Sequence, residues 1–324
     1  MKPTVYIPNL NGGERLLGTL ESLAGQSAAA GVVVVDNGST DRSVERASRR
    51  FPDARWVTLP TNQGFGRALN LAVRAYPADP LIFLNNDVRC EPDFVAALLH
   101  EVGSGVDAVA GVLIQGARPD RIDSAGVVVD RTLLAFDYLH GETPSRAQAA
   151  SAPLGPTGGA ALLRLDAFNA VGGFDARLFA YLEDVDLALR LRLVRPGRTC
   201  RLAGAARAEH HHSATLGAGS RQKAGLMGFG RGYLLRRYGV LRDPLLVVRA
   251  MTGEAIMCTA QLAVDRTTAG LSGRLRGWRT AAQVPRLPIP VDAASSLSLA
   301  DALRLRGRRA AGARATAARL ALRR

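Results

Sequence analysis

The chain of 324 residues contains only three cysteines, Cys90, Cys200 and Cys258, and they lie far apart in the sequence. No two of them form a CxxC pair, so the sequence indicates neither a disulfide framework nor a zinc site. A reducing compartment, the cytosol, is therefore the expected location of the protein.

The sequence also lacks a recognisable signal peptide and an uninterrupted membrane-spanning segment. Residues 1–8 are typical of a strand rather than of a charged region followed by an apolar one. The best candidate for a spanning helix, residues 245–264, contains Arg249 and Glu254, whereas a span needs about 20 mostly apolar residues. We therefore expect a protein that is neither secreted nor integral to a membrane.

Common nucleotide and nucleic-acid motifs are missing as well. No GxGxxG sequence opens a helix after the first expected strand and no GxxxxGK[ST] sequence occurs, which excludes dinucleotide-binding and P-loop sites. An RNP-type aromatic motif and zinc-finger spacing are also absent, so nothing specific favours nucleic acid as a partner.

Positive charge is abundant and unevenly distributed. The chain has 42 Lys and Arg against 28 Asp and Glu, a net charge of +14, and residues 241–324 hold 15 of the Arg but only five acidic residues. The basic tail is expected to contact an anionic membrane surface, where each Arg contributes about 1 kcal/mol. The alternatives are improved solubility and binding of nucleic acid.

Short apolar runs alternate with helical patterns through the first half of the chain. With 47% hydrophobic and 22% charged residues, the composition is that of a soluble globular protein. The expected strands are residues 4–7, 31–35, 55–59, 81–84, 108–114 and 160–165. The expected helices are residues 14–24, 66–76, 92–102, 166–171 and 184–194, with a further helix capped by Thr40 or Asp41. This β-α-β-α order predicts an α/β fold with a largely parallel sheet flanked by helices.

The pattern further predicts two domains. Residues 1–216 form the α/β domain, in which residues 115–157 are an insertion that contains a hairpin near residues 127–129. Residues 217–324 form a helical, Arg-rich C-terminal extension, whose last part, 301–324, is expected to be a frayed amphipathic helix or disordered.

Four polar clusters follow the first four strands: Pro8–Gly13, Asp36–Asp41, Thr61–Gly66 and Asn85–Asp87. Each alone is equally typical of a turn or a helix cap. Because ligands of open parallel sheets bind outside the carboxyl ends of the strands, the four together predict one polar binding edge. Asp87 could bind Mg²⁺ there, since this ion takes one or two carboxylates plus substrate phosphates.

Two further clusters could carry chemistry. Glu183, Asp184 and Asp186 lie at a helix start, where acidic residues either complement the helix dipole or supply a general base. His210, His211 and His212 are three of only five histidines in the chain, and they are either a solvated run or metal ligands.

These motifs, in this order, resemble family 2 glycosyltransferases of the GT-A fold, in particular the bacterial rhamnosyltransferase-like branch. The segments that carry the resemblance are VVVVDNGSTD at 32–41, NQGFGRALN at 62–70, LNNDV at 84–88, TGGAALL at 157–163, GGFDARLFAYLEDVDLALR at 172–190 and HHHSAT at 210–215. Together they cover about residues 4–216.

The resemblance implies a role for each matching position. The nucleotide-sugar donor would be held by Asn9, Asp36, Asn37, Ser39, Asn62, Gly64, Asn70 and Asn85, and Gly158 and Gly159 would lie beneath the donor sugar and the acceptor. Asp87 would bind a divalent ion, Mg²⁺ or Mn²⁺, with His210 as a second ligand and His211 and His212 as the alternatives. Asp184 would be the general base, with Glu183 and Asp186 as supports or alternatives. The chain departs from the family at Asn85, which replaces the first Asp of the Asp-x-Asp motif.

The implied activity is an inverting, metal-dependent transfer of a sugar to a hydroxyl of a lipid-linked or polysaccharide acceptor in cell-envelope glycan synthesis. Rhamnose from dTDP-rhamnose is one candidate donor, and the basic tail would dock the enzyme on the inner face of the plasma membrane. A nucleotidyltransferase fits less well, because no Lys lies near Asn9–Gly13. An inactive binding module that acts through the tail is the other alternative, and the presence of both Asp87 and Asp184 speaks against it.

Overall fold

The structure is a computed structural model that describes residues 2–211 and 220–293. These residues form two compact units. Within the described residues, the first unit consists of residues 2–127, 137–179 and 183–211, and the second of residues 128–136, 180–182 and 220–293. The division predicted at residue 216 left segments 128–136 and 180–182 in the first domain. The predictions for His212 and for residues 301–324 lie outside the described residues.

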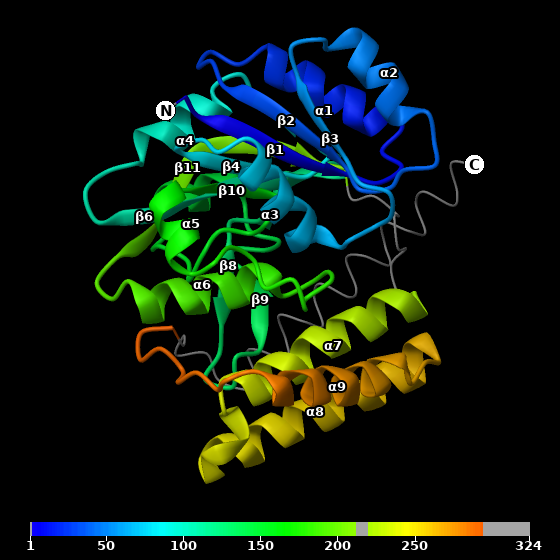
Figure 1. The fold of residues 1–324 in the computed structure, drawn as a ribbon. Helices are drawn as coiled ribbons and strands as arrows, with labels where there is room; N and C mark the ends of the chain where they lie inside the picture. The colour runs from blue at the N-terminus through cyan, green and yellow to red at the C-terminus, as the bar shows by residue number, and fades with distance from the viewer. Residues whose placement is uncertain (1, 212–219, 294–324) are drawn as a thin grey trace. The chain divides into compact units, whose positions relative to one another are not determined.

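A nine-stranded sheet forms the first unit (Figure 1). Its path runs β3, β2, β1, β4, β10, β6, β11, β5, and β7 pairs with β6. The strands are β1 (Thr4–Asn9), β2 (Gly31–Asp36), β3 (Arg55–Thr58), β4 (Leu81–Leu84), β5 (Val88–Cys90), β6 (Val106–Gln115), β7 (Arg118–Ser124), β10 (Ala160–Leu163) and β11 (Thr199–His210). Six strands run in one direction, while β5, β7 and β10 run in the other. The largely parallel sheet predicted from the sequence is confirmed.

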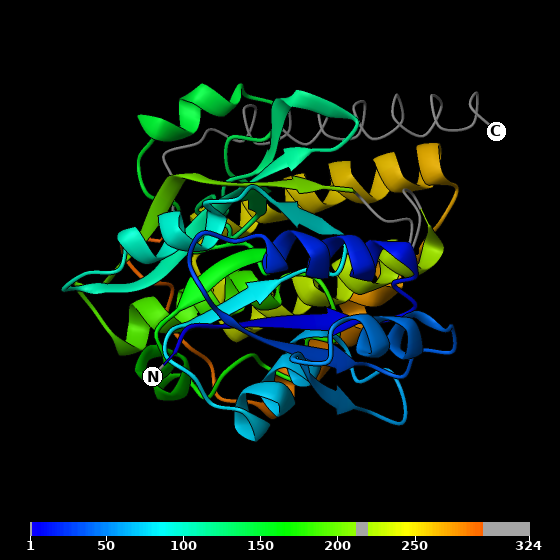
Figure 2. The ribbon, with the colours of Figure 1, turned by 90° about the horizontal axis from the view of Figure 1, so that it is seen from above.

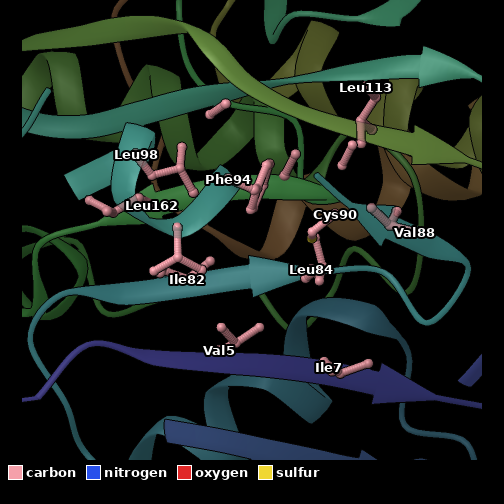
Figure 3. Close-up of a cluster of buried hydrophobic side chains, with 14 of the residues drawn as sticks. Val5, Ile7, Ile82, Leu84, Val88, Cys90, Phe94, Leu98, Leu113 and Leu162 are labelled. Atoms are coloured by element: carbon pink, nitrogen blue, oxygen red, sulfur yellow. The ribbon is translucent and has the colours of Figure 1, made fainter. Parts of the chain in front are cut away.

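Helices cover both faces of this sheet (Figure 2). They are α1 (Glu14–Ala24), α2 (Ser43–Arg50), α3 (Phe65–Ala75), α4 (Phe94–His100), α5 (Leu165–Ala170) and α6 (Glu183–Val194). Because successive side chains of a strand point to opposite faces, Ile82 and Leu84 of β4 pack in the cluster with α1 and α4, whereas Phe83 packs with α3, α5 and α6. Figure 3 shows the first of these clusters.

The insertion after β6 has more structure than the sequence indicated. It contains β7, the hairpin strands β8 (Val127–Val129) and β9 (Ala135–Asp137), and the short 3-10 helix η1 (Pro144–Gln148). The hairpin expected near residues 127–129 is confirmed. The sequence analysis missed β5, β7 and the twelve-residue strand β11, which pairs in parallel with β6.

The second unit is helical, as expected for the extension beyond residue 217. Its helices are α7 (Arg221–Arg237), α8 (Pro244–Asp265) and α9 (Ala269–Thr280), with one-turn 3-10 segments η2 (Val240–Arg242) and η3 (Ala281–Gln283). Helices α7 and α9 touch through glycines: a Cβ at Gly228 would lie 2.1 Å from the carbonyl oxygen of Gly270, and one at Gly277 would lie 1.9 Å from that of Phe229. The two backbones approach so closely only because no side chain intervenes.

Buried ion pairs hold the second unit together as well. Glu254 of α8 accepts hydrogen bonds from Arg231 of α7 and Arg274 of α9. Arg249 of α8 donates to the buried Asp130 in the turn of the hairpin, with Nη2 and Oδ2 3.0 Å apart. Both charges of α8 that the sequence analysis took as interruptions of an apolar span are thus engaged in internal ion pairs.

Candidate active site

The loops after β2 and β3 form the first part of the candidate site. Asn37 joins them: its Nδ2 donates to Oδ1 of Asn62 at 3.0 Å and to the carbonyl of Gly64 at 3.3 Å. Asp36 closes its own turn by accepting a hydrogen bond from the backbone N–H of Ser39 at 2.9 Å. Gly64 has a φ of 83°, and a Cβ there would lie 2.4 Å from the carbonyl oxygen of Phe179, so a side chain would be excluded at this helix start.

Asn9, at the end of β1, connects two of the polar loops. Its Nδ2 donates to Oγ of Ser39 and of Ser43, each at 3.2 Å, and its Oδ1 accepts from Nδ2 of Asn86 at 2.8 Å. The side chain is fully buried. The role of Asn9 as a donor ligand stays a prediction; in the structure its amide holds the loop after β2 and the loop after β4 in register.

The loop after β4 continues this network toward the middle of the sheet. Asn85 packs against Gly159, where a Cβ would lie 2.8 Å from Nδ2 of the Asn85 amide. Gly158, the residue before Gly159, donates its backbone N–H to Oδ2 of Asp184 at 3.2 Å. The structure therefore brings Asn85, both glycines and Asp184 together, although they come from three separate segments of the sequence.

Asp87 and His210 lie side by side. Nε2 of His210 is 3.4 Å from Oδ1 of Asp87, and the N–H of His211 donates to the Asp87 carbonyl at 2.9 Å. This proximity follows from β5 and β11, which pair His210 with Val88 in an antiparallel register. The structure thus favours His210 over His211 as the partner of Asp87.

A residue that the sequence analysis did not single out, Asp123 of β7, completes this group. Its Oδ2 lies 2.7 Å from Nδ1 of His210, on the ring edge away from Asp87. Burial lowers the pKa of His210, but the carboxylates of Asp123 and Asp87 outweigh that effect and raise it to about 10. The two carboxylates thus favour positive charge between them. Nothing in the sequence around Asp123 indicated this contact, which depends on the pairing of β7 with β6.

The donor set of this group fits a divalent cation in part. Within residues 2–211 and 220–293, no three His, Cys, Asp or Glu side chains are grouped as a ready-made ligand set. A carboxylate and an imidazole nitrogen are nevertheless adjacent at Asp87 and His210. Mg²⁺ typically binds through one or two protein ligands and takes its remaining ligands from substrate phosphates and water, so these two residues suffice for a cation that arrives with a diphosphate.

The start of α6 presents Glu183 and Asp184 after a strained turn. Tyr181 and Leu182 precede them with φ values of 70° and 68°, a conformation that is unfavourable for residues other than glycine. Asp184 is partly accessible and accepts hydrogen bonds from the N–H groups of Gly158 and Val185. Strained backbone of this kind is common at functional sites.

The two carboxyl groups lie in different environments. Burial and the neighbouring Asp184 raise the pKa of Glu183 to about 8, and no described residue donates a hydrogen bond to its Oε2. Burial also raises the pKa of Asp184, but its two backbone hydrogen bonds act in the opposite direction. Burial thus raises the pKa of both carboxyl groups, and the two backbone hydrogen bonds favour the ionised form of Asp184, the form that can accept a proton.

Two other predicted site residues, Asn70 and Asp186, make contacts within the first unit. Both amide atoms of Asn70 bond the backbone of Phe174, at 2.8 and 2.9 Å. Asp186 is fully buried and pairs with Arg190 at 2.7 Å, and Arg190 in turn binds the carbonyl of Gly173 at 2.8 Å. These contacts fix the segment before α6, and the roles predicted for Asn70 and Asp186 at the site stay predictions.

Residues 4–169 match the family described as Glycosyl transferase family 2. This is more than half of the chain. The protein belongs to this family. The matched residues include the polar loops after β1, β2, β3 and β4, as well as Gly158 and Gly159, and the family resemblance inferred from the sequence is confirmed.

A curated family member from Mycobacterium tuberculosis, N-acetylglucosaminyl-diphospho-decaprenol L-rhamnosyltransferase, is 32% identical to the chain over 202 residues. The match covers 55% of this chain and 65% of that protein, a little under two thirds of its length. Proteins of the same name and identity occur in two strains of this organism.

Two solved structures share the fold. GalNAc-T7 with UDP, GalNAc and Mn²⁺ aligns with a TM-score of 0.59 at 13% identity, covering 88% of this chain and 55% of that one. The mannosyltransferase PcManGT from Pyrobaculum calidifontis, in complex with GDP-Man and Mn²⁺, aligns with a TM-score of 0.53 at 19% identity, covering 99% and 80%. The GT-A type of fold predicted for this family 2 chain is confirmed.

Proposed function

We propose that the protein is an inverting, metal-dependent glycosyltransferase that moves a sugar from a nucleotide sugar to an acceptor hydroxyl. One observation carries the proposal: a continuous set of contacts runs from Ser39 through Asn9 to Asn86, and the adjacent Asn85 packs on the glycine pair that binds Asp184. Such a set can hold a nucleoside, a diphosphate and a reacting sugar along one sheet edge.

The nucleoside would be bound by the loops after β2 and β3. Asp36 carries an acceptor carboxylate at the end of its strand, and Asn37 fixes the loop that contains Asn62 and Gly64. The Asn85 amide would contact the ribose or the diphosphate, because it lies against Gly159 and follows the end of β4, next to Asn86, which contacts Asn9. An amide there carries no charge, so the metal site has one carboxylate fewer than the Asp-x-Asp motif supplies.

Asp87 and His210 would hold the divalent cation, Mg²⁺ or Mn²⁺. The chemistry that such a cation supplies is neutralisation of the negative charge that develops on the leaving nucleoside diphosphate. Asp123 would keep Nδ1 of His210 protonated and so direct Nε2 toward the cation.

Asp184 would accept the proton of the acceptor hydroxyl. The acceptor oxygen then forms a bond to the anomeric carbon while the bond from that carbon to the diphosphate oxygen breaks, and this single displacement inverts the anomeric configuration. Glu183, which keeps its own proton at neutral pH, would limit the negative charge next to Asp184. A positioned general base typically accelerates such a step by about 10² to 10⁴.

The relative's name suggests the substrates. That protein is named for transfer of L-rhamnose to N-acetylglucosaminyl-diphospho-decaprenol. We extend rhamnose as donor sugar and a lipid-linked or polysaccharide acceptor of the cell envelope to this chain, and with them a cytoplasmic location at the inner face of the plasma membrane. Its net charge of +14 supports the last point, since that membrane surface is anionic.

The decisive experiment measures donor binding and hydrolysis with a panel of UDP-, GDP- and dTDP-sugars, with and without Mn²⁺ or Mg²⁺. The variants are Asp87→Ala and Asp184→Asn, and Asp166→Asn, whose side chain is 51% exposed, is the matched control. We expect one donor to bind only with metal, to lose binding in Asp87→Ala, and to bind without turnover in Asp184→Asn. If no nucleotide sugar binds under any condition, the activity proposed here is wrong and the protein is a binding module.

A further inference from the structure

The surface of α8 is unlike any other surface of the described residues. Of the eleven large hydrophobic side chains that are exposed, six lie on this helix. They are Leu245, Val248, Met251, Ile256, Leu262 and Val264. Leu245 and Val248 are 84% and 69% exposed, whereas only Ala250, Gly253 and Glu254 of the 22 residues are buried.

Between Pro244 and Val264, no charged side chain of α8 is exposed. Arg249 and Glu254, the two charged residues between Pro244 and Val264, are turned into the ion pairs with Asp130 and with Arg231 and Arg274. The exposed remainder consists of apolar, Ala and Thr side chains. The same ion pairs that join the helices of the second unit therefore leave an uncharged face outside.

We infer that α8 lies flat in the interface of an anionic lipid bilayer, with this uncharged face inserted among the acyl chains and the neighbouring arginines on the lipid headgroups. The inference goes beyond the proposed activity and does not depend on the identity of the donor. A helix that lies in the membrane interface binds through its buried apolar area and through attraction of nearby basic residues to anionic lipid.

Charge decides between a bilayer and the other possible occupants of this face. Residues 220–293 contain twelve Lys and Arg against four Asp and Glu, and the exposed ones include Arg242 and Arg266 at the two ends of α8. A second copy would bring two such basic surfaces together. Residues 294–324 contain eight Arg and one Asp, so they would be repelled as well. Anionic lipid is the partner that complements both the apolar face and its basic border.

By length and composition α8 could also cross a membrane, which revises the expectation from the sequence that no segment could. Crossing would carry Arg249 and Glu254 into the hydrocarbon layer and separate them from Asp130, Arg231 and Arg274. Charged residues at that depth are strongly unfavourable. A helix lying in the interface keeps every one of these ion pairs, and the proposal therefore specifies attachment without crossing.

The test is flotation of the full-length protein with vesicles of phosphatidylglycerol and phosphatidylethanolamine, in the absence of substrate. We expect binding to fall at least tenfold in the double variant Leu245→Asp/Leu262→Asp. Val194→Asp is the matched control, because Val194 is an equally exposed apolar residue, 53% against 56% for Leu262, at the end of α6 in the first unit. The control should bind like the wild type, and circular dichroism melting should show that both variants are folded.

Three further measurements make the outcome decisive. Raising the salt concentration should weaken the wild-type interaction only in part, because an inserted apolar face is not screened; complete release would mean that charge alone binds the vesicle and would overturn the proposal. Release by alkaline carbonate is expected, and resistance to it would indicate a spanning helix. Light scattering that shows a dimer converted to a monomer by the double variant would assign the face to a second copy. Failure of any of these leaves the donor-binding experiment unaffected, so the two proposals fail separately.

Discussion

The two units of the chain achieve stability in different ways. The first unit packs large side chains from both faces of a sheet against six helices, so that strands such as β4 are fully buried. The second unit brings α7 and α9 together through backbone contacts at glycines and ties α8 to them by buried ion pairs. The second unit also buries apolar side chains such as Tyr233, Leu234 and Val240, yet it leaves six large apolar side chains of α8 exposed. The difference teaches that the first unit presents a polar sheet edge suited to a ligand, whereas the second unit presents the apolar surface of α8.

The largest effect that separates the units is expected from Asp184→Asn. The substitution removes the proposed base of the first unit with little change in shape, so kcat should fall by about 10² to 10⁴ while the donor affinity and the melting of the second unit stay unchanged. Steady-state kinetics with the donor found above and isothermal titration check this. A loss of donor affinity equal to the loss in kcat would mean that Asp184 binds substrate and is not the base.

Asp123→Asn tests whether β7 supports the metal site. The amide cannot keep His210 oriented as the carboxylate does, and loss of such an outer contact typically costs about 10- to 100-fold in metal affinity. Titration of the protein with Mn²⁺ and the nucleoside diphosphate of its donor measures it. Asp120→Asn, on the same strand with a side chain that is 65% exposed, is the control. Equal affinities for the two variants would restrict Asp123 to a structural role.

The glycine contact of the second unit is tested by Gly228→Ala. A Cβ there meets the carbonyl oxygen of Gly270 at 2.1 Å, so we expect a loss of about 1–3 kcal/mol in the free energy of unfolding of this unit. Gly225→Ala is the matched control on the same helix, since its Cβ finds its nearest atom at 3.7 Å; better helix propensity should leave this variant equally or more stable. Hydrogen exchange of the amides in α7 and α9 localises the effect. Similar protection in both variants would show that the helices do not depend on close approach.

The smallest effect concerns Glu183. Its pKa is raised in the folded state to about 8 from an ordinary value of 4.5, so between these pH values the folded chain holds a proton that the unfolded chain has lost. Stability from this group is therefore complete below about pH 4.5 and decreases as the pH rises toward 8. Glu183→Gln cannot titrate, so its melting temperature relative to the wild type should rise from pH 5 to pH 8. Glu14→Gln, a 72% exposed control, should show no such trend; the same trend in both would contradict the raised pKa.

Much of the first unit was predictable because its strands are short apolar runs followed by polar turns. The predicted strand at residues 81–84 coincides with β4, and the polar residues after it do lie at the candidate site. Asp87, His210 and Asp184 were singled out from sequence motifs, because the order and spacing of motifs can be recognised without knowledge of the packing.

The parts that could not be predicted depend on distant pairing. β11 has the sequence TCRLAGAARAEH, with few residues that favour strands, and it forms because β6 offers it a long parallel neighbour. The contact between Asp123 and His210 likewise cannot be predicted from the sequence, because it requires the pairing of β7 with β6. Asn70 and Asp186 look like ligands in a linear motif, yet their partners, the backbone of Phe174 and Arg190, fold back onto them. In the second unit, the sequence showed two charges within α8 but not that both are internally paired.

The glycine pair at 158 and 159 has a consequence for how this chain can diverge in evolution. A side chain at 158 would collide with the ring of Phe65 at 2.8 Å, and one at 159 would push the Asn85 amide away. Mutation at either position would therefore move the Phe65 ring at the start of α3 or the Asn85 amide before it reached the substrate. Lineages that change donor sugar are expected to do so at other positions and to retain both glycines, whereas Gly103, with open space around it, is free to vary.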